Sequence, residues 1–131
     1  MRWWGEPDDD FPSDEPESTR YAIELDGCLV GMIQYGEETE PDARHAWIDI
    51  FLDPAVHGRG LGTDAVRTLA AHLLDQGGHH RVTIDPAVEN RAAVRAYEKA
   101  GFRPVGVLEA AWRAPTGAWV DVLLLELVRR P

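Results

Sequence analysis

The glycine-rich stretch Asp53–Asp64, DPAVHGRGLGTD, most restricts what this chain can fold into. Gly58, Gly60 and Gly62 lie between the apolar run 46–52 and a helical pattern. Glycine tolerates positive φ and has no Cβ, so the backbone can turn tightly and direct consecutive N–H groups at one point. The first turn of the next helix adds unpaired N–H groups, which predicts a cradle for a phosphate or pyrophosphate. A flexible turn between two core elements is the alternative.

Two better-known phosphate loops do not occur in this chain. A P-loop requires Gly-x-x-x-x-Gly-Lys-Ser/Thr, and the sequence contains no Gly-Lys-Ser/Thr. The dinucleotide fingerprint requires Gly-x-Gly-x-x-Gly, whereas the glycines alternate in the GRGLG run of residues 58–62. Neither nucleotide motif therefore fits.

The charge of the 131 residues is −10 and is unevenly distributed. Residues 1–56 hold fifteen Asp and Glu against three Lys and Arg, a net charge of −12, whereas residues 57–103 have a net charge of +2. A strongly acidic chain repels nucleic acid and anionic membranes, so neither is expected as a partner. A cationic small molecule would be attracted to the acidic half, and an anionic ligand would have to bind the middle.

The length suits one domain over residues 1–131, with an irregular acidic segment over residues 1–20. No apolar run approaches the length of a membrane span, and the N-terminus lacks the apolar core of a signal peptide, which predicts a cytoplasmic protein. Cys28, the single cysteine, lies in a strand pattern and is expected to be a buried apolar residue. No pair of histidines has metal-ligand spacing, so no metal site is predicted.

Strand and helix signals alternate along the rest of the chain. Asp26 and Gly27 separate two apolar runs and predict a hairpin. The expected elements are strands at 21–25, 28–36 and 46–52, a helix from 63 to 76, a strand at 81–85, a helix from 91 to 100 and strands at 105–108 and 118–127. A strand, helix and strand in this order imply a parallel crossover, so Asp49 and Thr83 lie on neighbouring strands of one mixed sheet of about six strands. The fold class is α/β, with helices flanking the sheet.

Asp49 is a charged residue inside an apolar strand, where its neighbours are Trp47, Ile48, Ile50 and Phe51. Such a residue either points to the solvent side of a two-faced strand or lies where its charge is used. The residues alone leave both interpretations open.

Two segments resemble the GNAT superfamily of acetyl-CoA-dependent N-acetyltransferases. The run His57–Gly62 is similar to the family's Gln/Arg-x-x-Gly-x-Gly/Ala loop, with His57 in the first place. Residues 85–102, DPAVENRAAVRAYEKAGF, are similar to its coenzyme-binding helix and its Tyr-Glu-Lys-x-Gly-Phe ending. The resemblance implies the GNAT fold, in which the strands of Asp49 and Thr83 splay apart and the coenzyme inserts between them.

The resemblance also implies roles for single residues. Tyr97, a phenol with an ordinary pKa near 10, would protonate the departing thiolate, unless it is only an aromatic packed on the inner face of its helix. Asp49 would hold the acceptor amine or take its proton, and the N–H of Leu52 would stabilise the oxyanion. Arg91 and Arg95 are candidates to balance phosphate charge. The residues expected to contact acetyl-CoA are Leu52, His57, Gly58, Arg59, Gly60, Leu61, Gly62, Thr63, Asp85, Asn90, Ala93 and Tyr97.

Within the superfamily, the chain resembles the aminoglycoside 6'-N-acetyltransferase type. The resemblance lies in Trp3-Trp4-Gly5, the hairpin end GMIQYG and the GRGLGT run followed by residues 85–102. It implies an N-acetyltransferase acting on an aminoglycoside or a similar cationic primary amine. A lysine, a polyamine and a peptide amine remain open as acceptors, and a non-catalytic acyl-CoA-binding module is the alternative from another class.

Members of this type usually have a strand and a helix before the paired tryptophans, and we expect neither in this sequence. Without that strand, residues 21–25 would lie at an edge of the sheet, and an open edge invites pairing with another chain. We therefore expect a homodimer, or an edge that the N-terminal segment covers.

Overall fold

The computed structural model of the chain describes residues 2–3 and 18–131. The elements in chain order are β1 (Arg2–Trp3), β2 (Thr19–Leu25), β3 (Cys28–Glu38), β4 (His45–Leu52), a 3-10 turn (Pro54–Val56), α1 (Leu61–Asp75), β5 (Arg81–Ile84), α2 (Arg91–Lys99), β6 (Arg103–Arg113) and β7 (Trp119–Val128). The strands form one sheet in the order β1-β2-β3-β4-β5-β7-β6. Among the strands of residues 2–3 and 18–131, only β4 and β5 are parallel neighbours. The expected mixed sheet of about six strands is confirmed, with the two-residue β1 as an addition.

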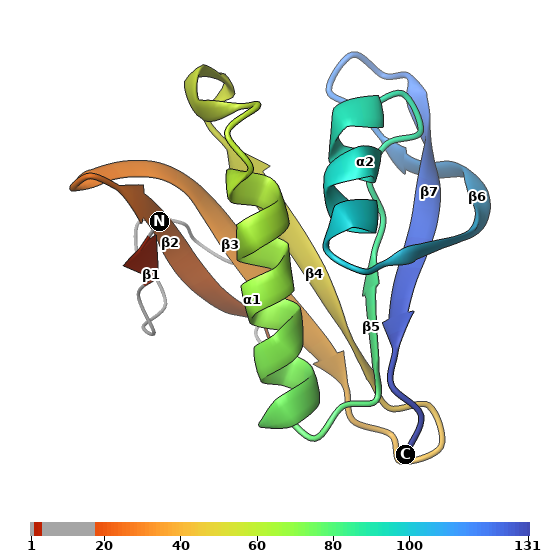
Figure 1. Cartoon of the computed structure of the whole chain (residues 1–131). Helices are drawn as coiled ribbons and strands as arrows, with labels where there is room; N and C mark the ends of the chain where they lie inside the picture. Colours follow the sequence, from red (N-terminus) through yellow and green to blue (C-terminus); the bar gives the residue numbers. More distant parts are fainter. Residues whose placement is uncertain (1, 4–17) are drawn as a thin grey trace.

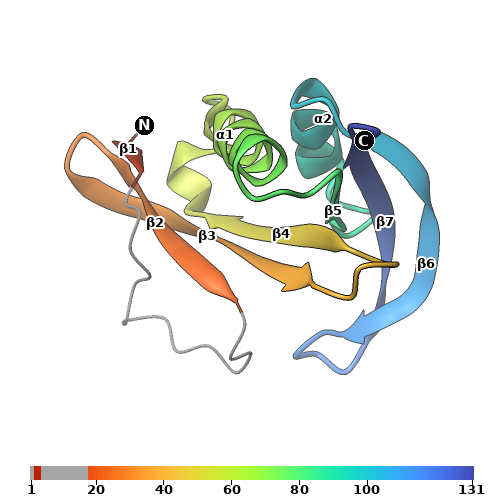
Figure 2. The same ribbon diagram turned by 90° about the horizontal axis from the view of Figure 1, so that it is seen from below.

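Both helices lie on the same face of the sheet, as the view from below shows (Figure 2). α1 crosses in front of β3 and β4, and α2 lies beside it near β5 and β7 (Figure 1). The core fills the space between helices and sheet and includes the buried residues Ile33, Ile48, Val66 and Leu125. Because side chains alternate along a strand, the neighbours of Ile33 and Ile48 point to the face without helices.

α1 has the spacing of an amphipathic helix, and its buried residues recur at intervals of three and four: Ala65, Val66, Leu69, Ala70, Leu73 and Leu74. It begins directly after Gly60, whose φ of 78° is left-handed and which provides no side-chain cap. The predicted start at Thr63 is two residues too late, because a glycine rather than a capping side chain begins this helix. No helix among the described residues is both long and apolar enough to cross a membrane.

The hairpin of β2 and β3 turns at Asp26 and Gly27, which have positive φ values of 53° and 83°. These values confirm the predicted Asp-Gly turn. A register shift between Ile23 and Glu24 moves every pair beyond it, counted from the turn, by one residue. As a result, Arg20 opposes Gln34. Such a bulge changes which side chains share a face of the sheet.

The two ends of the expected irregular segment are strands. Arg2–Trp3 pair with Ile23 and Glu24 as β1, and β2 begins at Thr19. The remainder of that segment lies outside the described residues. β1 covers part of the β2 edge, which is one of the two outcomes expected from the sequence. Cys28 is exposed rather than buried, because it directly follows the hairpin turn.

β4 and β5 pair over a short stretch that ends at Ile48 and Ile84. Beyond it, the chain follows β7 instead, and the carbonyl of Pro86 accepts the N–H of Leu123 at 2.9 Å. β4 continues to Leu52 beside β3. The two strands therefore diverge, as Figure 1 shows, and the predicted splay is confirmed.

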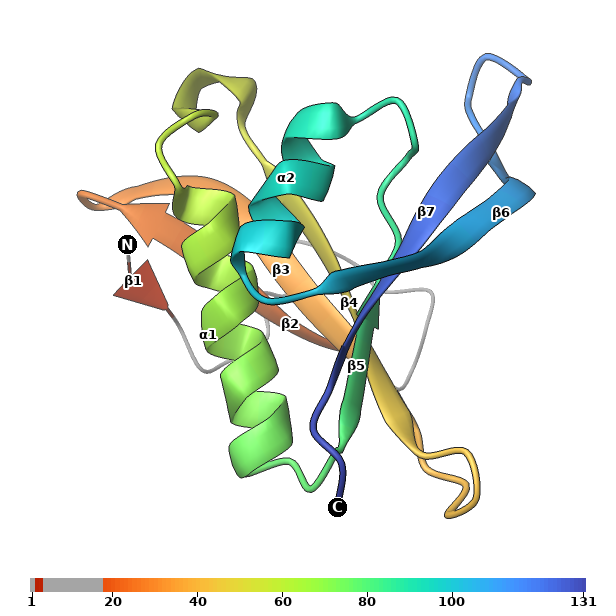
Figure 3. The same ribbon diagram turned by 45° about the vertical axis from the view of Figure 1, so that its right-hand side comes forward.

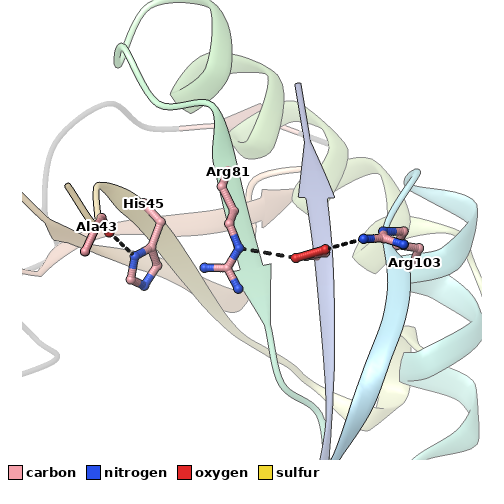
Figure 4. A network of polar contacts seen from close by, with 5 residues as sticks. Ala43, His45, Arg81 and Arg103 are labelled. Atoms are coloured by element: carbon pink, nitrogen blue, oxygen red, sulfur yellow. Dashed lines mark hydrogen bonds and ion pairs between the residues drawn. The ribbon is translucent and has the colours of Figure 1, made fainter. Parts of the chain in front are cut away.

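Glu126 of β7 bonds arginines of two neighbouring strands, Arg81 and Arg103, which Figure 4 labels. Its carboxylate accepts hydrogen bonds from Nε of Arg81 on β5 at 3.2 Å and from Nη2 of Arg103 on β6 at 2.8 Å. Burial raises the pKa of Glu126, but the bonds and charges of Arg103 and Arg81 outweigh burial and lower the pKa below its ordinary value. This network fixes β5, β7 and β6 where β4 and β5 are still paired.

Replacing Glu126 with Gln is expected to destabilise the protein at neutral pH by about 1–3 kcal/mol, because a buried carboxylate loses two charged hydrogen bonds. A depressed folded-state pKa stabilises the fold above the unfolded pKa of about 4.3, and this stabilisation disappears as pH falls through the folded value. Urea unfolding from about pH 3 to pH 8 measures the difference between the variant and the wild type. Glu109→Gln on the exposed β6 is the control. A destabilisation that stays constant over this range would contradict the assignment.

Candidate active site

A cavity of about 500 Å³ lies beside the part of β4 that has left β5. The end of β4, the glycine loop, the first turn of α1 and α2 surround it, and Figure 3 shows α2 next to α1. The lining residues are Ile50, Phe51, Leu52, Pro54, Val56, His57, Gly58, Gly60, Leu61, Gly62, Thr63, Asn90, Ala92, Ala93, Arg95, Ala96, Tyr97 and Lys99. Strand ends next to a helix N-terminus are the usual ligand position in open α/β sheets.

Ten of the twelve residues expected to contact a coenzyme line this cavity, and Arg59 and Asp85 do not. Of the two helix arginines expected near phosphate, Arg95 lines the cavity and Arg91 does not. Lys99 also lines it but was missed by the sequence analysis. Its position four residues after Arg95 places both cations on one side of α2, and this spacing would have identified it.

The N–H groups of residues 58–63 have no hydrogen-bond acceptor within the described part of the chain. The next donor, the N–H of Asp64, makes the first helical bond to the carbonyl of Gly60 at 3.0 Å. Gly58 and Gly60 have left-handed φ values of 81° and 78°. A row of free donors at a helix N-terminus is suited to an anion.

Two side chains hold this loop in place. Nε2 of His57 lies 3.0 Å from the carbonyl oxygen of Leu52, and since a carbonyl only accepts, Nε2 is the protonated nitrogen. The hydroxyl of Thr63 donates to the carbonyl of Ala96 at 3.0 Å. The first bond ties the loop to β4, and the second ties α1 to α2. Both side chains therefore act on the position of the loop.

The end of β4 presents peptide groups on the side of the splay. The N–H of Asp53 donates to the carbonyl of Val30 at 2.7 Å, and Leu52 opposes Gly31. Because hydrogen-bonded pairs alternate along antiparallel strands, Ile50 and Leu52 direct their N–H groups away from β3. β5 no longer pairs with β4 there. These N–H groups are therefore placed to bond a ligand of the cavity, which both residues line.

Tyr97 of α2 is 8% exposed and contributes to both the core and the cavity lining. Burial, and then the negative charge of Asp49, raise the pKa of Tyr97 to about 12. The phenol is thus a weaker acid than the sequence predicts. It stays protonated at neutral pH, so that it can donate a proton but cannot accept one.

Asp49 lies on β4, and Asp85 directly follows β5, so the two carboxylates come from the strands that diverge. Desolvation, and then the charge of Asp49, raise the pKa of Asp85. The charge of Asp49 also contributes to the raised pKa of Tyr97. Neither aspartate lines the cavity. Oδ2 of Asp49 accepts the Nε2–H of Gln34 at 3.2 Å. The negative charges of the two carboxylates repel each other, and a cation bound near both would reduce this repulsion.

The acetyltransferase (GNAT) family model matches residues 2–102 of this chain. The chain belongs to the GNAT family. It is 41% identical over 102 residues to an aminoglycoside N(6')-acetyltransferase type 1 of Klebsiella pneumoniae, a match that takes in 69% of this chain and 50% of that protein. It is 32% identical over 93 residues to the spermine/spermidine N(1)-acetyltransferase of Bacillus subtilis (strain 168), which covers 67% of this chain and 61% of that protein.

A solved structure of the family agrees with this fold. Mycobacterium smegmatis RimJ in complex with CoA-disulfide matches 86% of this chain and 53% of its own, with a TM-score of 0.78 and 29% identity. The GNAT chain described here spans about half the length of the aminoglycoside acetyltransferase that it resembles.

The interaction between Asp49 and Tyr97 can be tested without any substrate. One of the three tyrosines should ionise near pH 12, and Tyr97→Phe should remove that transition. Asp49→Asn should lower its midpoint, because a charge that favours the protonated phenol is removed. Ultraviolet difference titration measures the midpoint, while circular dichroism confirms the fold at each pH. Glu40→Gln on the β3–β4 loop is the control, and an unchanged midpoint in Asp49→Asn would show that the two groups are not neighbours.

Proposed function

We propose that this GNAT chain transfers the acetyl group of acetyl-CoA to a primary amine, with a cationic small molecule as the acceptor. The observation that carries the proposal is the row of free N–H groups at residues 58–63, next to a cavity at the splay of β4 and β5. A pyrophosphate requires such donors at a helix N-terminus. An extended arm that contains amide groups requires strand-like partners, which the end of β4 offers.

The residues of this site fit the coenzyme. The N–H groups of residues 58–63 would hold the pyrophosphate, and Arg95 and Lys99 on α2 would add positive charge. The N–H group of Ile50 would bond the pantetheine arm, which leaves the N–H of Leu52 for the acetyl group. When bound, the coenzyme supplies an acetyl thioester, and the remaining chemistry belongs to side chains of this chain.

Asp49 and Tyr97 supply the proton transfers. The reaction forms a C–N bond between the amine and the acetyl carbon and breaks the C–S bond. Asp49 binds the ammonium and takes one proton from it, directly or through water, which frees the amine to attack. Tyr97 gives its phenolic proton to the thiolate, and the second proton, which the nitrogen loses as the amide forms, returns to the Tyr97 phenolate through water. The N–H of Leu52 donates to the carbonyl oxygen on which negative charge develops.

A cationic acceptor would also compensate for the high pKa of Tyr97. Proton transfer from a phenol of pKa about 12 to the thiolate of a more acidic thiol is uphill. Part of this pKa comes from the charge of Asp49. An ammonium bound at Asp49 offsets that charge and lowers the pKa of Tyr97 in the complex.

The acceptor class is further supported by the second carboxylate and by the relatives. A cation near Asp49 and Asp85 would relieve the repulsion that contributes to the raised pKa of Asp85. One relative is named for aminoglycosides and another for spermine and spermidine, and both kinds of molecule are polycationic amines. We infer an aminoglycoside as the first candidate and a polyamine as the second. The homodimer and the cytoplasmic location remain predictions.

Calorimetry with acetyl-CoA tests the cradle. A Cβ at Gly62 would meet only Cδ1 of Leu52, at 3.5 Å, so that Gly62→Val should fold and still crowd the cavity. We expect binding to weaken at least about tenfold. Gly106→Val is the matched control, because a Cβ at this exposed position in β6 meets nothing within 4 Å. Unchanged binding by Gly62→Val, or no binding by the wild type, would exclude acetyl-CoA from this cavity.

Turnover of acetyl-CoA with kanamycin, spermidine, free lysine and a peptide amine identifies the acceptor. Kanamycin or spermidine is expected to be acetylated, because both are polycations that suit a site beside Asp49 and Asp85. Acetylation of the peptide alone would contradict the proposed acceptor class.

Two variants in the same assay test the proton transfers. Tyr97→Phe should lower kcat by about 100-fold with little change in acetyl-CoA affinity, because the ring and its packing remain. Asp49→Asn should mainly lower kcat/KM for the acceptor amine. This decrease should become smaller as pH rises, because more of the amine is then neutral. Tyr35→Phe is the control for the loss of a phenol. A near-normal rate in either test variant removes that residue from the mechanism.

A further inference from the structure

Three polar side chains form a chain of hydrogen bonds across β2, β3 and β4. Arg20 opposes Gln34, and Gln34 opposes Asp49. Nε of Arg20 donates to Oε1 of Gln34 at 3.1 Å, and Nε2 of Gln34 donates to Oδ2 of Asp49 at 3.2 Å. Ile33 and Ile48, the sequence neighbours of Gln34 and Asp49, pack in the core, so these polar side chains lie on the face without helices. These two hydrogen bonds connect the buried Arg20 to the exposed Asp49.

We propose that Gln34 is a positioning residue that orients the Asp49 carboxylate toward the acceptor amine, and that Arg20 sets the orientation of Gln34. The inference rests on the proposed function, in which Asp49 binds that amine. Neither Gln34 nor Arg20 lines the cavity beside β4. Both residues therefore act through Asp49 and not on the coenzyme.

The chemistry of the three groups permits one arrangement. The side-chain amide of a glutamine can present either its oxygen or its NH2 group to a neighbour. The guanidinium of Arg20 has donors and no acceptor, so only the oxygen of Gln34 can face it. The NH2 group then faces Asp49 and occupies Oδ2. Within the described part of the chain no hydrogen bond reaches Oδ1 of Asp49, which leaves this oxygen for an ammonium.

Gln34 also keeps two opposite charges apart. An arginine in direct contact with a carboxylate bonds both oxygens and neutralises their charge. The Gln34 amide bonds both Arg20 and Asp49, so Arg20 fixes the orientation of the amide and the amide fixes that of the carboxylate. Because the amide is neutral, it places no positive charge next to Asp49. The negative charge of Asp49 therefore remains for a cation, and the same charge acts on Asp85 and Tyr97.

Gln34→Glu separates positioning from packing. Glutamate keeps the shape and still offers an oxygen to Arg20, but it replaces the donor to Asp49 with a like charge directly opposite. We expect kcat/KM for kanamycin, or for spermidine if the wild type acetylates only spermidine, to fall at least about tenfold. The KM for acetyl-CoA should stay unchanged, and the melting temperature should fall by no more than a few degrees, roughly the effect of one like-charge pair. Gln76→Glu, the same change at an exposed position after α1, is the control.

Two substitutions of Arg20 provide the second comparison. Arg20→Lys keeps a group that only donates and should retain kcat/KM for the amine within about threefold. Arg20→Met keeps the length but lets the amide of Gln34 turn, so it should reproduce the loss seen in Gln34→Glu. The proposal is overturned if Gln34→Glu keeps the wild-type kcat/KM for the amine, or if the amine and acetyl-CoA are affected alike.

The NMR signals of the Gln34 side-chain NH2 group test the geometry without turnover. They should shift in Asp49→Ala and in Arg20→Met, because each variant removes one partner of the amide. If the signals keep the same chemical shifts in both variants, the positioning role is overturned, whether or not the variants are active. If the signals respond as expected but the wild type acetylates no amine, the proposed function fails while the positioning of Asp49 stands.

Discussion

The divergence of β4 and β5 follows from the hydrogen bonds that the chain makes after β5. Pro86 has no N–H, and its carbonyl bonds Leu123, while the N–H of Val88 bonds the carbonyl of Asp121, so this segment follows β7. β4 cannot turn with it, because it is paired with β3 as far as Leu52. The free peptide groups of β4 and the separation of two carboxylates both depend on this divergence.

The candidate site then divides into two ends of opposite charge. Arg95 and Lys99 line the cavity beside the glycine loop, whose own N–H groups stay free because His57 and Thr63 hold the loop through their side chains. The carboxylate of Asp49 lies outside that lining, on the face without helices. An anionic coenzyme and a cationic acceptor would therefore be attracted to different ends of one site. Tyr97 belongs to the cavity lining, and the charge of Asp49 contributes to its raised pKa.

Most of the fold could be predicted, because its signals are local. The Asp-Gly turn, the apolar stripe of α1 and the cap at Asn90, whose side chain accepts the N–H of Ala93 at 3.1 Å, each depend on a few neighbouring residues. The strand Arg2–Trp3 could not be predicted, since two residues show no periodicity. Six of the ten expected coenzyme contacts that line the cavity lie within residues 57–63, because a glycine loop places consecutive residues together. The other four, Leu52, Asn90, Ala93 and Tyr97, come from β4 and from α2 with its cap, and they were predicted through the family resemblance.

The sequence by itself determined the order of strands and helices and the position of the loop. Only the tertiary structure decided which distant side chains meet and how far each is buried. The register shift next to Glu24 makes Arg20 oppose Gln34, whereas an unshifted hairpin would place it opposite Ile33, which packs in the core. Burial and the charge of a residue on another element set the pKa of Tyr97. The bulge belongs to the pairing of two strands, and the burial of Tyr97 arises from the packing of several elements, so neither can be predicted from the residues of one element alone.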